Sequence, residues 1–324
     1  MTVVVVDSSL PRVSVCLLTY NRAAMLPRSI DSLLAQSHGD FELIINDDCS
    51  TDGTEEVCRS YAKSDPRVRY FKNPTNLTFS GNQNAAILRA TSDYVALVHQ
   101  GDVYRPNLLE KWTESLVRNP SAALVFNALE QADDQGRAVR VYRHPYGPLV
   151  RGLQMFDEMI RIRSSPIFGI AMVRRQCVLA AGPFDPRLPI LADVDMWLRL
   201  LLHHDAAYVS EPLFMAPARE PGTPIDSSNW RVRGEHELIY ALNSARRFPD
   251  DHAKVAKLRR EITPMLWKVR LEAVAFCLWH RRWRAALEGA AFSLRHVDFA
   301  AGALPDSVLD WNGAMARLEG QSTR

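Results

Sequence analysis

The stretches VSVCLLTYN (13–21), FELIINDDCSTDG (41–53) and YVALVHQGD (94–102) decide the fold, because each passes from an apolar run into polar turn residues. Short runs of β-branched and aliphatic residues between turn signals are typical of buried strands. A segment with helical spacing of its apolar residues follows each run, which predicts a mostly parallel α/β sheet with right-handed crossovers. Ligands of such sheets bind beyond the carboxyl ends of the strands. We therefore predict one pocket there that collects Thr19, Asn21, Asp47, Asp48, His99 and Asp102.

Composition is that of an ordinary globular protein, with 324 residues, 47% hydrophobic and 23% charged. A net charge of +2 provides no general field for nucleic acid, so we expect no nucleic-acid partner. The five cysteines form no Cys-x-x-Cys pair, which favours a reducing compartment. No run approaches the ~20 apolar residues of a membrane span. We expect a cytoplasmic protein that can still lie on the inner face of the membrane.

The pattern divides the chain into three parts. An N-terminal tail (1–11) precedes an α/β unit (12–222), in which 68–71 and 122–126 complete five strands expected to run parallel. A weaker stretch over 131–166 contains a short predicted strand, 138–142, and suits a lid or an acceptor-side insertion. Four prolines between Pro212 and Pro224 indicate the end of this unit.

The last part, 223–324, is predicted to be a basic helical appendage. Between Ala253 and His296 ten Lys or Arg residues stand against three Glu, and apolar stripes begin at Trp267 and Trp283. Basic amphipathic helices favour contact with an anionic membrane surface or a partner. The alternative is that both stripes pack on the α/β unit.

Four blocks of this sequence resemble the family 2 glycosyltransferases with a GT-A fold. They are VSVCLLTYNR (13–22), DFELIINDDCSTDGT (40–54), which begins 27 residues later, Asn84, and ADVDMWLR (192–199). The resemblance runs from about residue 12 to about residue 218. It implies an inverting enzyme that transfers a sugar from a nucleotide-diphosphate-sugar to a hydroxyl of a glycan or lipid-linked acceptor, in the synthesis of cell-surface polysaccharide or glycoconjugate.

The resemblance also implies roles for individual residues. A carboxylate such as that of Asp48 accepts hydrogen bonds only, which suits a pyrimidine N–H or ribose hydroxyls. Asp193 matches the catalytic base, which takes the proton of the attacking acceptor hydroxyl. Asp195, two residues on, points another way on a helix and is the less suitable base. The residues that the resemblance assigns to the nucleotide-sugar are Thr19, Tyr20, Asn21, Asp47, Asp48, Asn84, Gln100 and Asp102.

The sequence departs from the family pattern at the end of the fourth strand, which usually carries Asp-x-Asp-Asp. In the register set by Pro106, His99 and Gly101 take the places of the first two acids, and Asp102 remains. This departure leaves three alternatives. Either His99 and Asp102 rebuild a site for a divalent cation, or transfer depends little on metal, or activity has been lost. Mg²⁺ prefers oxygen ligands, whereas Mn²⁺ tolerates imidazole.

Two other functions compete with sugar transfer. Nucleotidyl transfer on a similar sheet would call for a Gly-rich, Lys-containing phosphate loop near the first strand, which the sequence lacks. A catalytically impaired nucleotide-sugar-binding or scaffold protein is the second, and its basis is the replacement of acids by His99 and Gly101.

Overall fold

The structure is a computed structural model, and it describes about two thirds of the chain. It describes residues 10–133, 135–162, 164–186, 188 and 190–217, and beyond these 239, 240, 242, 243, 246–248, 253 and 260. The predicted stripes that begin at Trp267 and Trp283 lie outside the described residues. Within the described part, no helix combines the length and the hydropathy that a membrane span needs.

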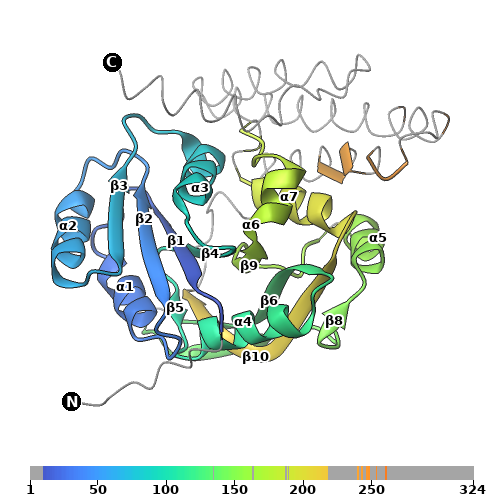
Figure 1. Ribbon diagram of the computed structural model, residues 1–324, viewed down its shortest axis with the longest axis horizontal. Helices are drawn as coiled ribbons and strands as arrows, with labels where there is room; N and C mark the ends of the chain where they lie inside the picture. The colour runs from blue at the N-terminus through green and yellow to red at the C-terminus, as the bar shows by residue number, and fades with distance from the viewer. Residues whose placement is uncertain are drawn as a thin grey trace, which may run out of the picture.

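Strands and helices alternate over residues 13–99, as Figure 1 shows. The strands are β1 (Val13–Thr19), β2 (Phe41–Asp47), β3 (Val68–Lys72), β4 (Tyr94–His99), β5 (Val103–Tyr104), β6 (Ala122–Ala132), β7 (Ala138–Tyr142), β8 (Leu149–Val150), β9 (Ala171–Arg174) and β10 (Asp205–Pro217). The helices are α1 (Leu26–Leu34), α2 (Thr54–Ser64), α3 (Thr78–Arg89), α4 (Leu108–Arg118), α5 (Gly152–Ile162), α6 (Arg175–Ala181) and α7 (Ala192–Leu201). The α/β class and the short strand at 138–142 are confirmed.

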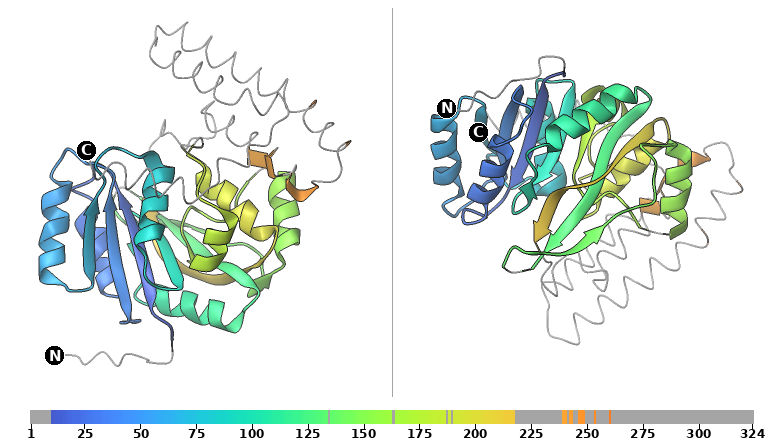
Figure 2. Two further views of the ribbon diagram at one scale, coloured as in Figure 1. Left: turned by 45° about the horizontal axis from the view of Figure 1, so that its top comes forward. Right: turned by 90° about the horizontal axis from the view of Figure 1, so that it is seen from below.

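One mixed sheet has the strand order β3-β2-β1-β4-β9-β6-β10-β5, with β7 paired to β6 and β8 to β10. Neighbours are parallel from β3 to β4, so these strands end at one edge. Helices cover both sides of the sheet (Figure 2). Apolar residues of α1, α2 and α4 join the core on one face, and those of α3, α5, α6 and α7 join the core on the other. Because each central strand is buried on both faces, its sequence is a continuous apolar run.

The five strands expected to run parallel do share one direction, but the fifth, β6, does not pair with β4. Strand β9 lies between β4 and β6 and is antiparallel to both. Helix α5 was also not predicted. Sequence periodicity identifies strands but does not say which strands pair. The position of β9 depends on its pairing with β4 and β6, which lie about 50 to 80 residues earlier in the chain.

Strand β10 continues through Pro212 to Pro217, inside the predicted α/β unit (12–222). The pairing of β10 with β6 shifts register on both sides of Pro212. Proline has no N–H to donate, so within a sheet it is accommodated at such irregularities. Beyond β10, the buried residues Ile239, Tyr240 and Leu242 join the core on the α7 side.

Candidate functional site: a cleft at the carboxyl ends of the parallel strands

An open cleft of about 310 Å³ lies at the carboxyl ends of β1, β2 and β4, beside the start of α3. The residues that line it are Leu18, Thr19, Tyr20, Asp48, Asn76, Thr78, Phe79, Asn82, His99 and Gln100. This is the edge at which ligands of open α/β sheets bind. The sequence analysis named five of these residues. Three others that it expected in the same pocket, Asn21, Asp47 and Asp102, are not among the lining residues.

Asp48 is the carboxylate of this cleft. One of its oxygens accepts hydrogen bonds from the Leu77 main-chain N–H (2.8 Å) and from the Asn73 side-chain amide (3.0 Å). Burial raises the pKa of Asp48 above its ordinary value, the charge of Asp47 adds to this, and the two hydrogen bonds oppose it. Asp48 therefore fixes the loop that leads into α3 and also presents an acceptor to the cleft.

Asp47 and Asn21 build the loops around the cleft. The two Asp47 oxygens accept from the Ser50 main-chain N–H (2.9 Å) and the Tyr70 hydroxyl (2.7 Å). The Asn21 main-chain N–H donates to the Ser50 hydroxyl (2.9 Å), and the Asn21 side chain accepts from the Thr51 main-chain N–H (2.8 Å). The loops after β1 and β2 are thereby joined into one unit.

Gln100 joins the loops after β1 and β4. Its side-chain carbonyl accepts from the Thr19 hydroxyl (2.6 Å) and from the Tyr20 main-chain N–H (3.1 Å). Asn84, by contrast, lies away from the cleft. Its side-chain amide exchanges two hydrogen bonds with the main chain of Phe184, at 2.8 and 3.0 Å, and so connects α3 to the segment before α7.

Backbone strain is concentrated around the cleft. In the described part of the chain, the non-glycine residues with positive φ are Asn21, Cys49 and Thr78, at 48°, 65° and 66°. A β-branched residue such as Thr78 rarely adopts this conformation. Strained conformations of this kind cost about 1–3 kcal/mol each and cluster at functional sites, where the surrounding structure fixes them. Their position supports the assignment of this cleft as the functional site.

The turn after β4 has a backbone conformation that strains a side chain at the position of the second family acid. Gly101 has φ +91°, and a Cβ at this position would lie 2.8 Å from the terminal methyl of Met25. Its N–H donates to the Ser29 hydroxyl (2.8 Å), which in turn donates to the Asp102 main-chain carbonyl (2.8 Å). The turn is thus bound to α1 in a conformation that favours glycine.

Metal ligands were predicted at His99 and Asp102. His99 lines the cleft, whereas Asp102 is buried outside its lining. Among the residues that the structure describes, no group of three or more His, Cys, Asp or Glu side chains is arranged to hold a metal ion. Metal dependence therefore stays a prediction.

His99 and Asp193 flank the same point of backbone. Gly169 has φ +80°, and a Cβ at this position would lie 2.8 Å from Cε1 of His99 and 3.3 Å from Oδ2 of Asp193. Asp193 is in the first turn of α7, as predicted, and 8% of it is exposed. Phe79 packs edge-on against the His99 ring, at 5.6 Å between centroids. The predicted base and the residue that replaces the first family acid thus lie close together.

Sequence reasoning missed Phe79, Asn82 and Gly169. One signal was available for the first two, because the predicted helix carries four polar residues within five positions, Ser80, Asn82, Gln83 and Asn84. Three of them, Ser80, Asn82 and Asn84, make hydrogen bonds to other parts of the chain. Gly169 gave no signal, since its role depends on a contact with residues from β4 and α7.

Comparison with known proteins decides the family. The family model described as "Glycosyl transferase family 2" matches residues 14–178, slightly more than half of the chain. The chain belongs to glycosyl transferase family 2. It is therefore a glycosyltransferase, as the resemblance implied. The matched region contains the cleft but ends before Asp193.

Relatives of this family 2 glycosyltransferase include two bacterial proteins with provisional names. The teichuronic acid biosynthesis glycosyltransferase TuaG of Bacillus subtilis is 27% identical over 71% of this chain and 87% of its own length. The colanic acid biosynthesis glycosyl transferase WcaA of Escherichia coli is 28% identical over 60% of this chain and 67% of its own length.

Solved structures share the GT-A fold. Residues 1–349 of S. aureus TarS in complex with UDP-GlcNAc align with a TM-score of 0.60 and 18% identity, over 81% of this chain and 73% of that one. The mannosyltransferase PcManGT from Pyrobaculum calidifontis, in complex with GDP-Man and Mn²⁺, aligns with a TM-score of 0.54 and 18% identity, over 98% and 83%. At such identities the likeness shows the fold alone.

Proposed function

We propose that this glycosyltransferase inverts the anomeric centre as it transfers one sugar from a nucleotide-diphosphate-sugar to a hydroxyl of a glycan or lipid-linked acceptor. The observation that carries the proposal is the arrangement around one cleft. Asp48 and Thr19 lie at the ends of β2 and β1, and Asp193 lies close to His99 across Gly169. The donors that TarS and PcManGT bind in their solved structures support a nucleotide-sugar.

Asp193 is the proposed base. In a single displacement the acceptor oxygen bonds to the anomeric carbon as the bond from that carbon to the diphosphate oxygen breaks. The proton of the acceptor hydroxyl passes to the Asp193 carboxylate, and the diphosphate leaves with the electron pair. The low exposure of Asp193 suits a base that acts in a site from which water is largely excluded.

Asp48 is proposed to accept a hydrogen bond from the nucleotide. Leu77 and Asn73 both donate to Oδ1 of Asp48, so Oδ2 is the oxygen proposed to accept from the nucleotide. Thr19 and Asn82, which carry a hydroxyl and an amide, also line this cleft. Both groups can donate or accept, which suits a base edge or ribose hydroxyls.

Dependence on a divalent cation is proposed to be weak. Its lining contains one imidazole, His99, and one carboxylate, Asp48, whereas Asp102, the acid of the turn after β4, is buried outside that lining. If any cation supports the reaction, we expect Mn²⁺ to do so better than Mg²⁺, because Mn²⁺ tolerates a nitrogen ligand.

Cell-surface polysaccharide synthesis is the proposed setting, supported by the names of TuaG and WcaA. We place the reaction in the cytoplasm, at the inner face of the membrane, where lipid-linked acceptors would be found. Support comes from Cys16, Cys49, Cys58 and Cys177, which are free thiols. Sedimentation of the full chain with acidic vesicles tests the membrane contact: binding at low salt that is lost at high salt is expected, and no binding at low salt contradicts it.

The test of the function is a panel of nucleotide-sugars, with UDP-GlcNAc, UDP-glucose, UDP-galactose and GDP-mannose as the first four. We expect slow release of nucleoside diphosphate from one of them, and loss of that release in Asp193→Asn. Binding of a nucleotide-sugar without release, even with candidate acceptors present, would instead favour the catalytically impaired binding protein.

A further inference from the structure

Asp195 is the centre of a buried charge network on α7. It is 1% exposed, and its two oxygens accept from Nε of Arg199 (2.8 Å), Nη1 of Arg246 (2.8 Å) and the Asn243 amide (2.9 Å). Burial alone would raise the pKa of Asp195, but the two guanidinium groups lower it to about 2. Asp195 is therefore ionised at neutral pH and needs these partners, because an unpaired buried carboxylate is costly.

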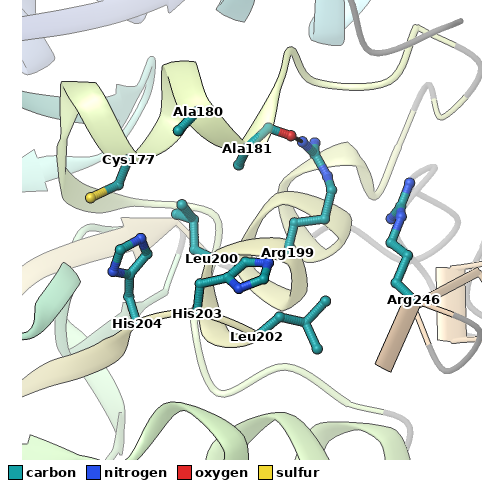
Figure 3. A pocket seen from close by; sticks show the side chains of 9 residues that line it. All are labelled: Cys177, Ala180, Ala181, Arg199, Leu200, Leu202, His203, His204 and Arg246. Atoms are coloured by element: carbon teal, nitrogen blue, oxygen red, sulfur yellow. Dashed lines mark hydrogen bonds between the residues drawn. The ribbon is translucent and has the colours of Figure 1, made fainter. Parts of the chain in front are cut away.

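Arg199 connects this network to the turn after α6. Its guanidinium donates to three consecutive main-chain carbonyls, those of Ala181, Gly182 and Pro183, at 2.6, 3.1 and 2.9 Å. Figure 3 shows the side chain of Arg199 reaching from α7 to Ala181 at the end of α6. Phe184, the next residue, is bonded to Asn84 on α3. Three helices on one face of the sheet are thus fixed relative to one another.

Arg246 and Asn243 come from a different part of the chain, beyond β10 and beyond the region that the family model matches. Arg246 also donates to the Asn243 side chain (3.0 Å), so the two residues approach Asp195 as a pair. Arg246 is 22% exposed, at the side of a second cleft of about 340 Å³ (Figure 3). Truncating its side chain therefore enlarges an existing opening and does not create a sealed cavity.

The network acts on the helical turn that carries the proposed base, because Asp195 is two residues after Asp193 on α7. We propose that Arg246 is a positioning residue, which holds the first turn of α7 through Asp195 and so places the Asp193 carboxylate. This inference rests on the proposed function. Displacing a reacting group by ~1 Å can cost about 10²-fold in rate, so the network need move α7 only slightly to matter.

Packing alone already holds the body of α7, since Met196, Trp197 and Leu198 are fully buried. Removing one partner of a buried ion pair is destabilising when it leaves the other charge unpaired, but Arg199 and Asn243 still bind the Asp195 carboxylate when Arg246 is lost. We therefore expect loss of Arg246 to affect the rate of transfer more than the fold. Asn243 provides a second arm, because its amide reaches the same carboxylate.

Arg247 offers a matched control next to Arg246. Its guanidinium lies 4.0 Å from the Asp157 carboxylate, and that carboxylate is 62% exposed. The substitution Arg247→Ala therefore removes the same charge from the same segment and leaves the contacts of Asp195 unchanged. The experiment compares Arg246→Ala, Arg246→Lys and Arg247→Ala in the full chain, with Asp193→Asn as reference. It measures nucleoside diphosphate release and donor affinity, with whichever sugar nucleotide of the panel is turned over.

We expect Arg246→Ala to lower kcat about tenfold with donor affinity within about twofold, Arg246→Lys to recover most of the loss, and Arg247→Ala to match the parent protein. Equal kcat in Arg246→Ala and Arg247→Ala, with Asp193→Asn inactive, overturns the positioning role and leaves the proposed function standing. Asp193→Asn with parental kcat, or no turnover of any donor, overturns the proposed function and this inference together. A loss in donor affinity as large as the loss in kcat points to a distorted donor site and also contradicts the inference.

Discussion

The loops after β2 and β4 lie at the same edge of the sheet, yet they differ in what they offer a donor. The first retains the paired acids of the family pattern, and Asp48 presents a carboxylate to the cleft. The second replaces two acids by His99 and Gly101, and Ser29 fixes the glycine turn on α1. Under the proposed function, the side of the cleft after β2 binds the nucleotide, and the side after β4 has to stabilise the leaving group without two of the family acids.

The largest expected effect is that of removing the proposed base, which separates donor binding from the chemical step. Asp193→Asn should lower turnover by roughly 10²-fold or more, the usual contribution of a general base, while the affinity for the donor stays nearly unchanged. Steady-state release of nucleoside diphosphate gives the rate, and calorimetric titration with the donor gives the affinity. Near-parental turnover would assign the proton transfer to another group.

The next prediction separates the two adjacent aspartates. Asp48→Ala should weaken donor binding about tenfold or more, since hydrogen bonds to a charged group are worth about 1.5–3 kcal/mol. Asp47→Asn is its control: it should leave donor affinity within about threefold and lower the free energy of unfolding by about 1–2 kcal/mol, because Asp47 binds Ser50 and Tyr70. Titration calorimetry and urea unfolding measure the two effects, and equal donor affinities in both variants would remove the distinction.

A smaller effect tests the glycine turn. Gly101→Ala should reduce the free energy of unfolding by about 1–2 kcal/mol, because a side chain is strained at φ +91° and its Cβ would meet Met25. Gly147→Ala is the matched control, since nothing lies within 4 Å of the added Cβ. It should change stability by less than about 0.5 kcal/mol. The same strain predicts that Gly101→Asp destabilises the turn, so this substitution is a poor way to restore a metal ligand.

Local pattern predicted much of this fold but little of the fine structure of the cleft. The apolar runs identified β1, β2 and β4, because both faces of these strands are buried and the signal is continuous. The sequence alone does not distinguish the roles of two adjacent aspartates such as Asp47 and Asp48. Their separation into a loop builder and a cleft residue depends on Tyr70 and Asn73, which arrive from another part of the chain.

Long-range contacts explain the remaining differences. Asn84 matched a family position but is bonded to Phe184, 100 residues away. The role of Gly169 follows from its approach to His99 and Asp193, which neither composition nor periodicity encodes. The predicted base, in contrast, could be placed at the start of a helix because acids in a first turn are a local signal.

The smallest expected effect is also the most direct test of the central comparison, that the side of the cleft after β4 no longer depends on a carboxylate-held cation. The measurement is titration of the exhaustively chelated protein with its nucleotide-sugar, repeated after addition of Mn²⁺ or Mg²⁺, with turnover recorded in parallel. We predict that donor affinity and turnover change by no more than about threefold, and that Mn²⁺ has the larger effect. Complete loss of turnover in chelator, restored by micromolar Mg²⁺, would contradict the account.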